Sequence, residues 1–154
     1  MTDLLNWQWN ELNKHRKGEN ILNGTQEFKI EVINRQSGMD FKDTVEERSV
    51  CTYRESRGVY YISYKTEDAH VLIKAGNGMV IVRRTGGYGS EMIYETGKET
   101  EFEYRTPYGS IPMRMSTEYV SFMLGEDGGV IELRYILYAG GDKLINEMKI
   151  KIER

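Results

Sequence analysis

Apolar and polar residues alternate along four segments of this chain, and this alternation restricts the fold more than any other feature. Residues 28–32, FKIEV, set three apolar side chains on one face of an extended strand and two charged side chains on the other. Period two over such lengths predicts half-buried strands of an antiparallel sheet. The same pattern recurs in residues 98–105, 130–137 and 144–153.

Six further segments rich in Val, Ile and Tyr are predicted to be strands, and turn-like sequences such as Gly76-Asn77-Gly78 separate them. About ten strands in hairpin succession must satisfy their exposed edges, either by closing into a barrel or by stacking as two sheets. Near-neighbour hairpins favour an all-β, antiparallel up-and-down barrel of about 8–10 strands over residues 25–154. The six segments are residues 44–54, 58–66, 70–75, 79–84, 90–95 and 117–124.

The first 24 residues differ from the rest of the chain. Leu5, Trp9 and Leu12 recur at the i, i+4, i+7 spacing of a helix, so a short helical or irregular segment is expected ahead of the barrel. The tryptophans Trp7 and Trp9 favour a plug packed over one open end of the barrel. A helix that binds a partner or a membrane surface is the alternative, although the segment lacks the rich basic face of surface helices.

Composition is that of a soluble protein in a reducing compartment. Cys51 is the single cysteine and cannot form an internal bridge, so a cytoplasmic location is expected. Neither a signal-peptide pattern nor an apolar stretch of membrane-spanning length is found, so we expect no export and no membrane partner. The net charge of −3 comes from interspersed acidic and basic residues, so nucleic acid is not expected as a partner either.

The sequence contains no recognisable catalytic constellation, and it predicts no enzyme, no cofactor and no metal site. Two histidines, His15 and His70, with one cysteine cannot make a dense Cys/His metal cluster, and both are interpreted as exposed or capping residues. TGGYGS, residues 85–90, invites comparison with a phosphate-binding loop, but such loops open onto a helix and here β-like sequence follows. A hairpin at the barrel rim is the better interpretation.

Polar residues at inward-facing strand positions are more informative, because a buried polar group is costly unless it is hydrogen-bonded. Arg84, Glu47, Tyr135 and Asn146 each share a strand face with apolar neighbours. Arg84 and Glu47 form either a structural ion pair across the barrel or the anchor of an anionic or polar ligand.

Both prolines fall in the stretch EYRTPYGSIPMRM, residues 103–115. Pro107 begins a predicted turn, whereas Pro112 lies inside the next strand, where it must sit at an edge, at a bulge or on an unpaired side. We therefore expect the hydrogen-bond ladder to be interrupted near Pro112, with Tyr108 at the rim beside that gap and a ligand entrance there.

Four motifs occur in one order along the chain: YYISY (60–64), VIVRRTGG (80–87), TPYGSIPMRMST (106–117) and IELRYILYAGG (131–141), followed by Asn146. In these motifs the chain resembles the YwiB-like family over roughly residues 26–153. That family consists of small bacterial β-barrels of the calycin, or lipocalin-like, group with a domain of unknown function. The resemblance implies a cytoplasmic, lipocalin-like barrel without an established activity, and a fold alone does not supply a function.

Three classes of function are compared. The preferred one is a non-enzymatic module that binds a small, partly apolar ligand in the barrel interior. The chain has eleven tyrosines and four phenylalanines, and a tyrosine side chain offers such a ligand both an apolar ring and a polar hydroxyl. The alternative is a filled structural barrel that acts in protein–protein interaction or homodimerisation, and an enzyme ranks last. The candidate ligand-binding residues are Arg84, Glu47, Tyr60, Tyr64, Tyr108, Tyr135 and Asn146.

Overall fold

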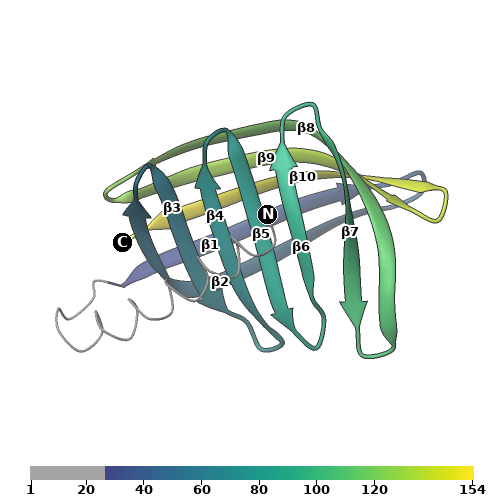
Figure 1. Ribbon diagram of the computed structural model, residues 1–154, viewed down its shortest axis with the longest axis horizontal. Coiled ribbons are helices and arrows are strands. Elements are labelled where there is room, and N and C mark those ends of the chain that lie inside the picture. Colours follow the sequence, from purple (N-terminus) through teal and green to yellow (C-terminus); the bar gives the residue numbers. More distant parts are fainter. Residues whose placement is uncertain (1–26) are drawn as a thin grey trace.

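The protein is an antiparallel all-β barrel of ten strands in a computed structural model that describes residues 27–154 (Figure 1). The prediction of an antiparallel β-barrel is therefore confirmed. The predicted N-terminal helix and plug fall in residues 1–26, outside the described residues. The strands are β1 (Phe28–Ser37), β2 (Lys42–Ser56), β3 (Val59–Lys65), β4 (Ala69–Gly76), β5 (Met79–Gly86), β6 (Ser90–Glu95), β7 (Glu99–Thr106), β8 (Gly109–Gly125), β9 (Gly128–Ala139) and β10 (Asp142–Glu153).

The strands follow one another around the barrel in the order β6-β5-β4-β3-β2-β1-β10-β9-β8-β7. Each strand thus pairs with its neighbours in the sequence, except that β6 and β7 stand at the two ends of this order, and β1 pairs with β10 to join the first and last described strands. Tight hairpins make this succession possible. In the β4–β5 turn, for example, Asn77 and Gly78 have φ of 54° and 73°, as a two-residue turn of this kind requires.

Two long strands form the corners of the barrel. Strand β2 pairs with β1 over its first ten residues and then with β3 over its last five. Strand β8 pairs with both β7 and β9 and carries a register shift between Thr117 and Tyr119. Such strands let a sheet turn sharply, so that β3–β6 cross β1, β9 and β10 steeply (Figure 1).

The facing edges of β6 and β7, called the seam below, are joined at few points within residues 27–154. Gly89 and Arg105 exchange two backbone hydrogen bonds, of 2.9 and 2.8 Å, at one end. At the other end the β6–β7 turn is held to β8: the amide of Gly97 donates to the carbonyl of Thr117, and the amide of Thr117 donates to the carbonyl of Lys98. The barrel is therefore nearly closed, with its weakest join in the middle of the chain rather than at its ends.

Apolar side chains fill one end of the barrel, here called the filled end. Phe28 packs against Tyr53 with 4.9 Å between ring centroids, and Tyr53 packs against Tyr60 at 5.7 Å. The only cysteine, Cys51, is buried in this core, and burial raises the pKa of its thiol to about 12. The remaining fully buried apolar residues include Ile62, Val71, Ile73, Val80, Ile131, Leu133, Ile150 and Ile152.

The prediction about Pro112 is confirmed on one side of its strand and wrong on the other. Pairing of β8 with β7 runs unbroken past Pro112, which stands opposite Glu103. Pairing of β8 with β9, in contrast, begins only at Arg114, opposite Tyr138. Pro112 therefore lies where β8 has no partner on its β9 side, so its missing N–H interrupts no ladder there.

Substitution of Gly89 should weaken the seam. A Cβ atom at Gly89 would lie 3.1 Å from the carbonyl oxygen of Arg84 and 3.2 Å from two guanidinium nitrogens of Arg105, whereas one at Gly87 meets nothing within 4 Å. We expect Gly89→Ala to lower the free energy of unfolding by about 1 kcal/mol through overpacking. Hydrogen exchange at the Gly89 and Arg105 amides should accelerate, while Gly87→Ala leaves both unchanged; equal behaviour of the two variants would contradict the close approach.

Candidate functional site

The opposite end of the barrel, called the mouth below, opens into a cavity of about 1070 Å³. The cavity lies between the β1–β2 hairpin, the β3–β4 loop and the β5–β6 connection, and it extends to the seam. This volume is at the upper end of the roughly 300–1,000 Å³ of small-molecule sites. Residues lining it include Val32, Asn34, Gln36, Val45, Glu47, Arg84, Tyr88, Ser90, Met92, Phe102, Tyr104, Ile111, Met113, Tyr135, Leu137 and Met148.

The polar centre of the mouth is an ion pair between Arg84 and Glu47, to which the hydroxyl of Tyr64 is hydrogen-bonded. Nη2 of Arg84 lies 2.6 Å from Oε1 of Glu47, and Nη1 donates to Oε2 at 3.3 Å, so the contact is bidentate. The hydroxyl of the buried Tyr64 donates to Oε1 of Glu47 at 3.0 Å. Side chains alternate between the two faces of each strand, and this places Glu47 of β2, Tyr64 of β3 and Arg84 of β5 inside the barrel. The inward direction of Arg84 and Glu47 agrees with the sequence pattern.

The protonation states of this centre follow from its surroundings. Burial opposes the charge of Arg84, but the hydrogen bond and the charge of Glu47 outweigh it and raise the pKa of Arg84. Burial raises the pKa of Tyr64 as well, and the carboxylate of Glu47 adds to this effect. Arg84 is therefore a cation and Tyr64 a neutral phenol at neutral pH, and the centre can orient a ligand by hydrogen bonds.

Three amide side chains form a second polar group, on β1 and β10. Asn146 is fully buried and its Oδ1 accepts hydrogen bonds from Asn34 at 3.1 Å and from Gln36 at 2.9 Å. Its own amide donates to the carbonyl of Leu144 at 3.0 Å. Asn146 is thus satisfied and holds the two amides that line the cavity. The Oδ1 atom of Asn34 is buried without a hydrogen-bond partner in residues 27–154.

Tyr135 lines the floor of the cavity from β9. Its ring meets that of Tyr94 edge to face, with 4.8 Å between centroids, and burial raises the pKa of both phenols. Tyr135 therefore adds an amphipathic ring to the wall of the cavity.

Two predicted site residues lie elsewhere. Tyr60 packs in the filled end, because β3 carries Tyr60 and Tyr64 on the same face but at opposite ends of the strand. Tyr108 sits at the tip of the β7–β8 turn with 94% of its surface exposed and does not line the cavity. Inward parity cannot tell the two ends of a barrel apart, so the sequence could not show that Tyr60 lies away from the cavity.

Sequence reasoning missed several lining residues. Asn34 and Gln36 continue the inward face of Phe28, Ile30 and Val32, so extending the first alternating segment by four residues would have found them. Met92 and Phe102 line the cavity from either side of the seam, and no local pattern shows that their strands face each other. TGGYGS forms the end of β5, the β5–β6 connection and the start of β6, and Tyr88 in it stacks on Tyr104 at 6.1 Å between ring centroids. The predicted rim hairpin is therefore confirmed.

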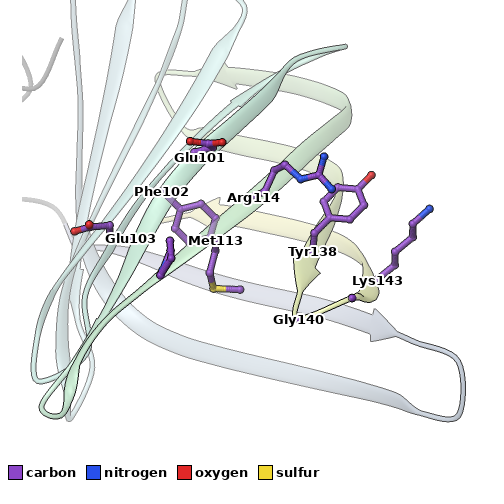
Figure 2. Close-up of a pocket in the computed structure, with 10 residues that line it drawn as sticks. Glu101, Phe102, Glu103, Met113, Arg114, Tyr138, Gly140 and Lys143 are labelled. Atoms are coloured by element: carbon purple, nitrogen blue, oxygen red, sulfur yellow. The ribbon is translucent and has the colours of Figure 1, made fainter.

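A second hollow, of about 890 Å³, lies where β8 separates from β9 (Figure 2). Pro112 lines it, and Phe102 and Met113 line both this hollow and the cavity, so the two adjoin. On its other side the guanidinium carbon of Arg114 lies 4.2 Å from the ring centroid of Tyr138. The region near Pro112 is thus a side opening next to the cavity.

Other chemistry-bearing groups lie outside the mouth. On the outer face of β3 and β4, Oγ of Ser63 lies 3.0 Å from Nε2 of His70, so the interpretation of His70 as an exposed or capping residue is wrong. The Ser63 hydroxyl belongs to a residue with 1% of its surface exposed, so a substrate could not reach it.

Within residues 27–154, no group of three or more His, Cys, Asp or Glu side chains is placed to hold a metal ion. No helix of that part is long and apolar enough to cross a membrane. His15 falls outside the described residues.

A family model described as "Domain of unknown function (DUF1934)" matches residues 30–152 of the chain. The chain belongs to this family. It is 24% identical over 106 residues to the "uncharacterized beta-barrel protein YwiB" of Bacillus subtilis strain 168, covering 66% of this chain and 75% of that protein. The crystal structure of YwiB from Bacillus subtilis superposes with a TM-score of 0.77 at 23% identity, over 82% of this chain and 90% of that one. The resemblance to the YwiB-like proteins is confirmed, and the likeness to the solved structure shows the fold alone.

Loss of the charge on Glu47 should destabilise the protein more than loss of a matched surface charge. Glu47→Gln leaves the half-buried Arg84 without its anion, and we expect a loss of about 1–3 kcal/mol in the free energy of unfolding. Glu31, whose carboxylate lies 2.9 Å from the largely exposed Arg48, is the control, and Glu31→Gln should cost less than about 1 kcal/mol. Urea denaturation measures both; equal losses would show that the Arg84–Glu47 pair behaves as a surface ion pair.

Proposed function

We propose that the protein is a non-enzymatic, lipocalin-like module that binds a small, partly apolar molecule in the cavity at the mouth. The observation that carries this proposal is the cavity itself, which reaches Arg84 although the other end of the barrel is filled. An apolar wall with a few convergent polar groups is what small-molecule sites usually have. A cytoplasmic location accompanies the proposal, because the single cysteine is free and buried.

The charges at the mouth select the class of ligand. Glu47 already neutralises Arg84, so an anionic ligand would have to compete with a carboxylate that is held at 2.6 Å. A neutral molecule meets no such competition. The guanidinium has five N–H donors, which exceeds its two bonds to Glu47. We therefore propose an uncharged ligand with an apolar body and a polar end that accepts hydrogen bonds.

The side opening is the proposed route of entry. Pro112 lines it without interrupting a ladder, and Met113 stands between it and the cavity. A ligand could pass there without breaking the β7–β8 or β9–β10 pairing.

A filled cavity should bind less. Met148 lines the cavity and Met123 is an outer-face residue with 82% of its surface exposed, so Met148→Trp and Met123→Trp form a matched pair. We expect Met148→Trp to weaken binding of the neutral, apolar dye Nile red by roughly tenfold or more, about 1.4 kcal/mol, and Met123→Trp to leave it unchanged. Fluorescence titration measures this.

Native mass spectrometry of protein purified from its own cells tests the ligand itself. The proposal expects a retained small molecule on the wild type and on Met123→Trp but not on Met148→Trp. Dye binding that is equal in all three proteins, together with no retained mass, would contradict the proposal.

A surface for protein partners is a second candidate, because exposed apolar side chains surround the mouth. Met39 and Phe41 are exposed at the β1–β2 hairpin, and Tyr108 and Ile111 are exposed at the β7–β8 hairpin. Large exposed apolar groups that gather at one end mark interaction sites, here for homodimerisation or another protein. Sedimentation at micromolar concentration should then show a dimer that Tyr108→Ser with Ile111→Ser converts to monomer; a wild-type monomer would count against homodimerisation.

A further inference from the structure

The hollow where β8 separates from β9 has walls of opposite charge. Glu101 and Glu103 line it from β7, and Lys143 lines it from β10 on the other side (Figure 2). Pro112 and Met113 of β8 lie between these walls, since β8 runs between β7 and β9. The hollow thus combines an apolar middle with a few charged groups, and its volume of about 890 Å³ is within the range of small-molecule sites.

Two cations on the β10 side share the ring of Tyr138. The guanidinium carbon of Arg114 lies 4.2 Å from the ring centroid, and Nζ of Lys143 lies 5.8 Å from it. Strand register produces this arrangement, because Arg114 stands opposite Tyr138 in the β8–β9 pair and Lys143 stands opposite Tyr138 in the β9–β10 pair. Cation–π contacts attract both flexible side chains to one ring. The ring therefore holds two cations where one anionic group can meet both.

Neither cation is held strongly by a carboxylate of residues 27–154. Arg114 pairs with Glu99 at 3.4 Å, and both side chains are about half exposed, so this ion pair is weak. Lys143 is exposed and contacts the Tyr138 ring instead. Arg84 in the mouth differs, because Glu47 holds it at 2.6 Å. An anionic group therefore meets less competition in the hollow than in the mouth.

The acidic wall is also open to a ligand. Glu101 stands opposite Arg114 in the β7–β8 pair, which balances its charge in part. Glu103 stands opposite Pro112, so no cation faces it across the strand pair. Both glutamates are exposed. The carboxylate of Glu103 is therefore placed to pair with the ammonium group of a ligand.

We propose that the hollow binds a short zwitterionic peptide that lies across the strands, with its carboxylate at Arg114 and Lys143 and its ammonium group at Glu103. The apolar side chains of the peptide rest on Pro112 and Met113. Strands β7 and β10 are three strand intervals apart, or roughly 14 Å at the usual spacing. An extended residue spans about 3.4 Å, so a peptide of about four residues matches this distance.

Pro112 favours a short peptide over a strand of another protein. The edge of β8 on its β9 side has no partner strand within residues 27–154 before Arg114, and open edges of this kind can pair with other chains. Pro112 cannot donate a backbone hydrogen bond, and prolines on edge strands discourage such pairing. Side-chain charges rather than a hydrogen-bond ladder therefore select the ligand. This inference does not depend on the proposed ligand of the mouth, because the peptide lies on the outside of the barrel wall.

A nuclear magnetic resonance titration of the full chain with alanyl-leucyl-leucyl-alanine, both termini free, tests the proposal. We expect the peptide to shift the amide signals of residues 101–103 and 138–143. Lys143→Gln and Glu103→Gln should each raise the Kd by about fivefold, as expected for the loss of one exposed ion pair. Lys151→Gln and Glu153→Gln, which remove exposed charges at the other end of β10, are the controls and should leave the Kd unchanged.

Blocking the peptide termini assigns each end of the ligand without altering the protein. The N-acetylated peptide should bind the wild type about fivefold more weakly, with no further loss in Glu103→Gln. The C-amidated peptide should likewise be insensitive to Lys143→Gln. The proposal is wrong if millimolar peptide leaves the signals around the hollow unshifted, or if the doubly blocked peptide binds the wild type as tightly as the free one. Equal effects of Lys143→Gln and Lys151→Gln would also overturn it.

Discussion

Pairing of β1 with β10 is the interaction on which the rest of the barrel depends. Nine residue pairs from Lys29↔Glu153 to Ser37↔Ile145 join the two strands without a register shift. This pairing joins the hairpins of β2–β6 to those of β7–β9 in one continuous sheet. This join is long and regular, whereas the seam between β6 and β7 is joined at few points, with Gly89 and Arg105 at one end.

The two ends of the barrel differ because the strands separate toward the mouth. At the filled end, aromatic residues such as Phe28 and Tyr53 occupy the interior. Toward the mouth, β8 leaves β9 beyond Arg114, and the interior becomes wide enough to hold water or a small molecule. The polar groups gather at this end for the same reason: Arg84 and Glu47 have a smaller desolvation cost beside an open cavity than they would have in the packed core.

The sequence by itself determined the class of fold, the strands, the rim position of TGGYGS and the inward direction of Glu47, Arg84 and Tyr135, because each follows from period-two alternation or from local turn chemistry. It did not determine that Glu47 meets Arg84, which is 37 residues away, or that Tyr60 lies in the filled end and Tyr108 in solvent. Those facts depend on how strands are staggered around a closed barrel and on where two of them separate. The alternation of apolar and polar residues does not encode that stagger, because the same inward pattern is compatible with either end of the barrel. Only the tertiary structure therefore decided which polar residues share a site.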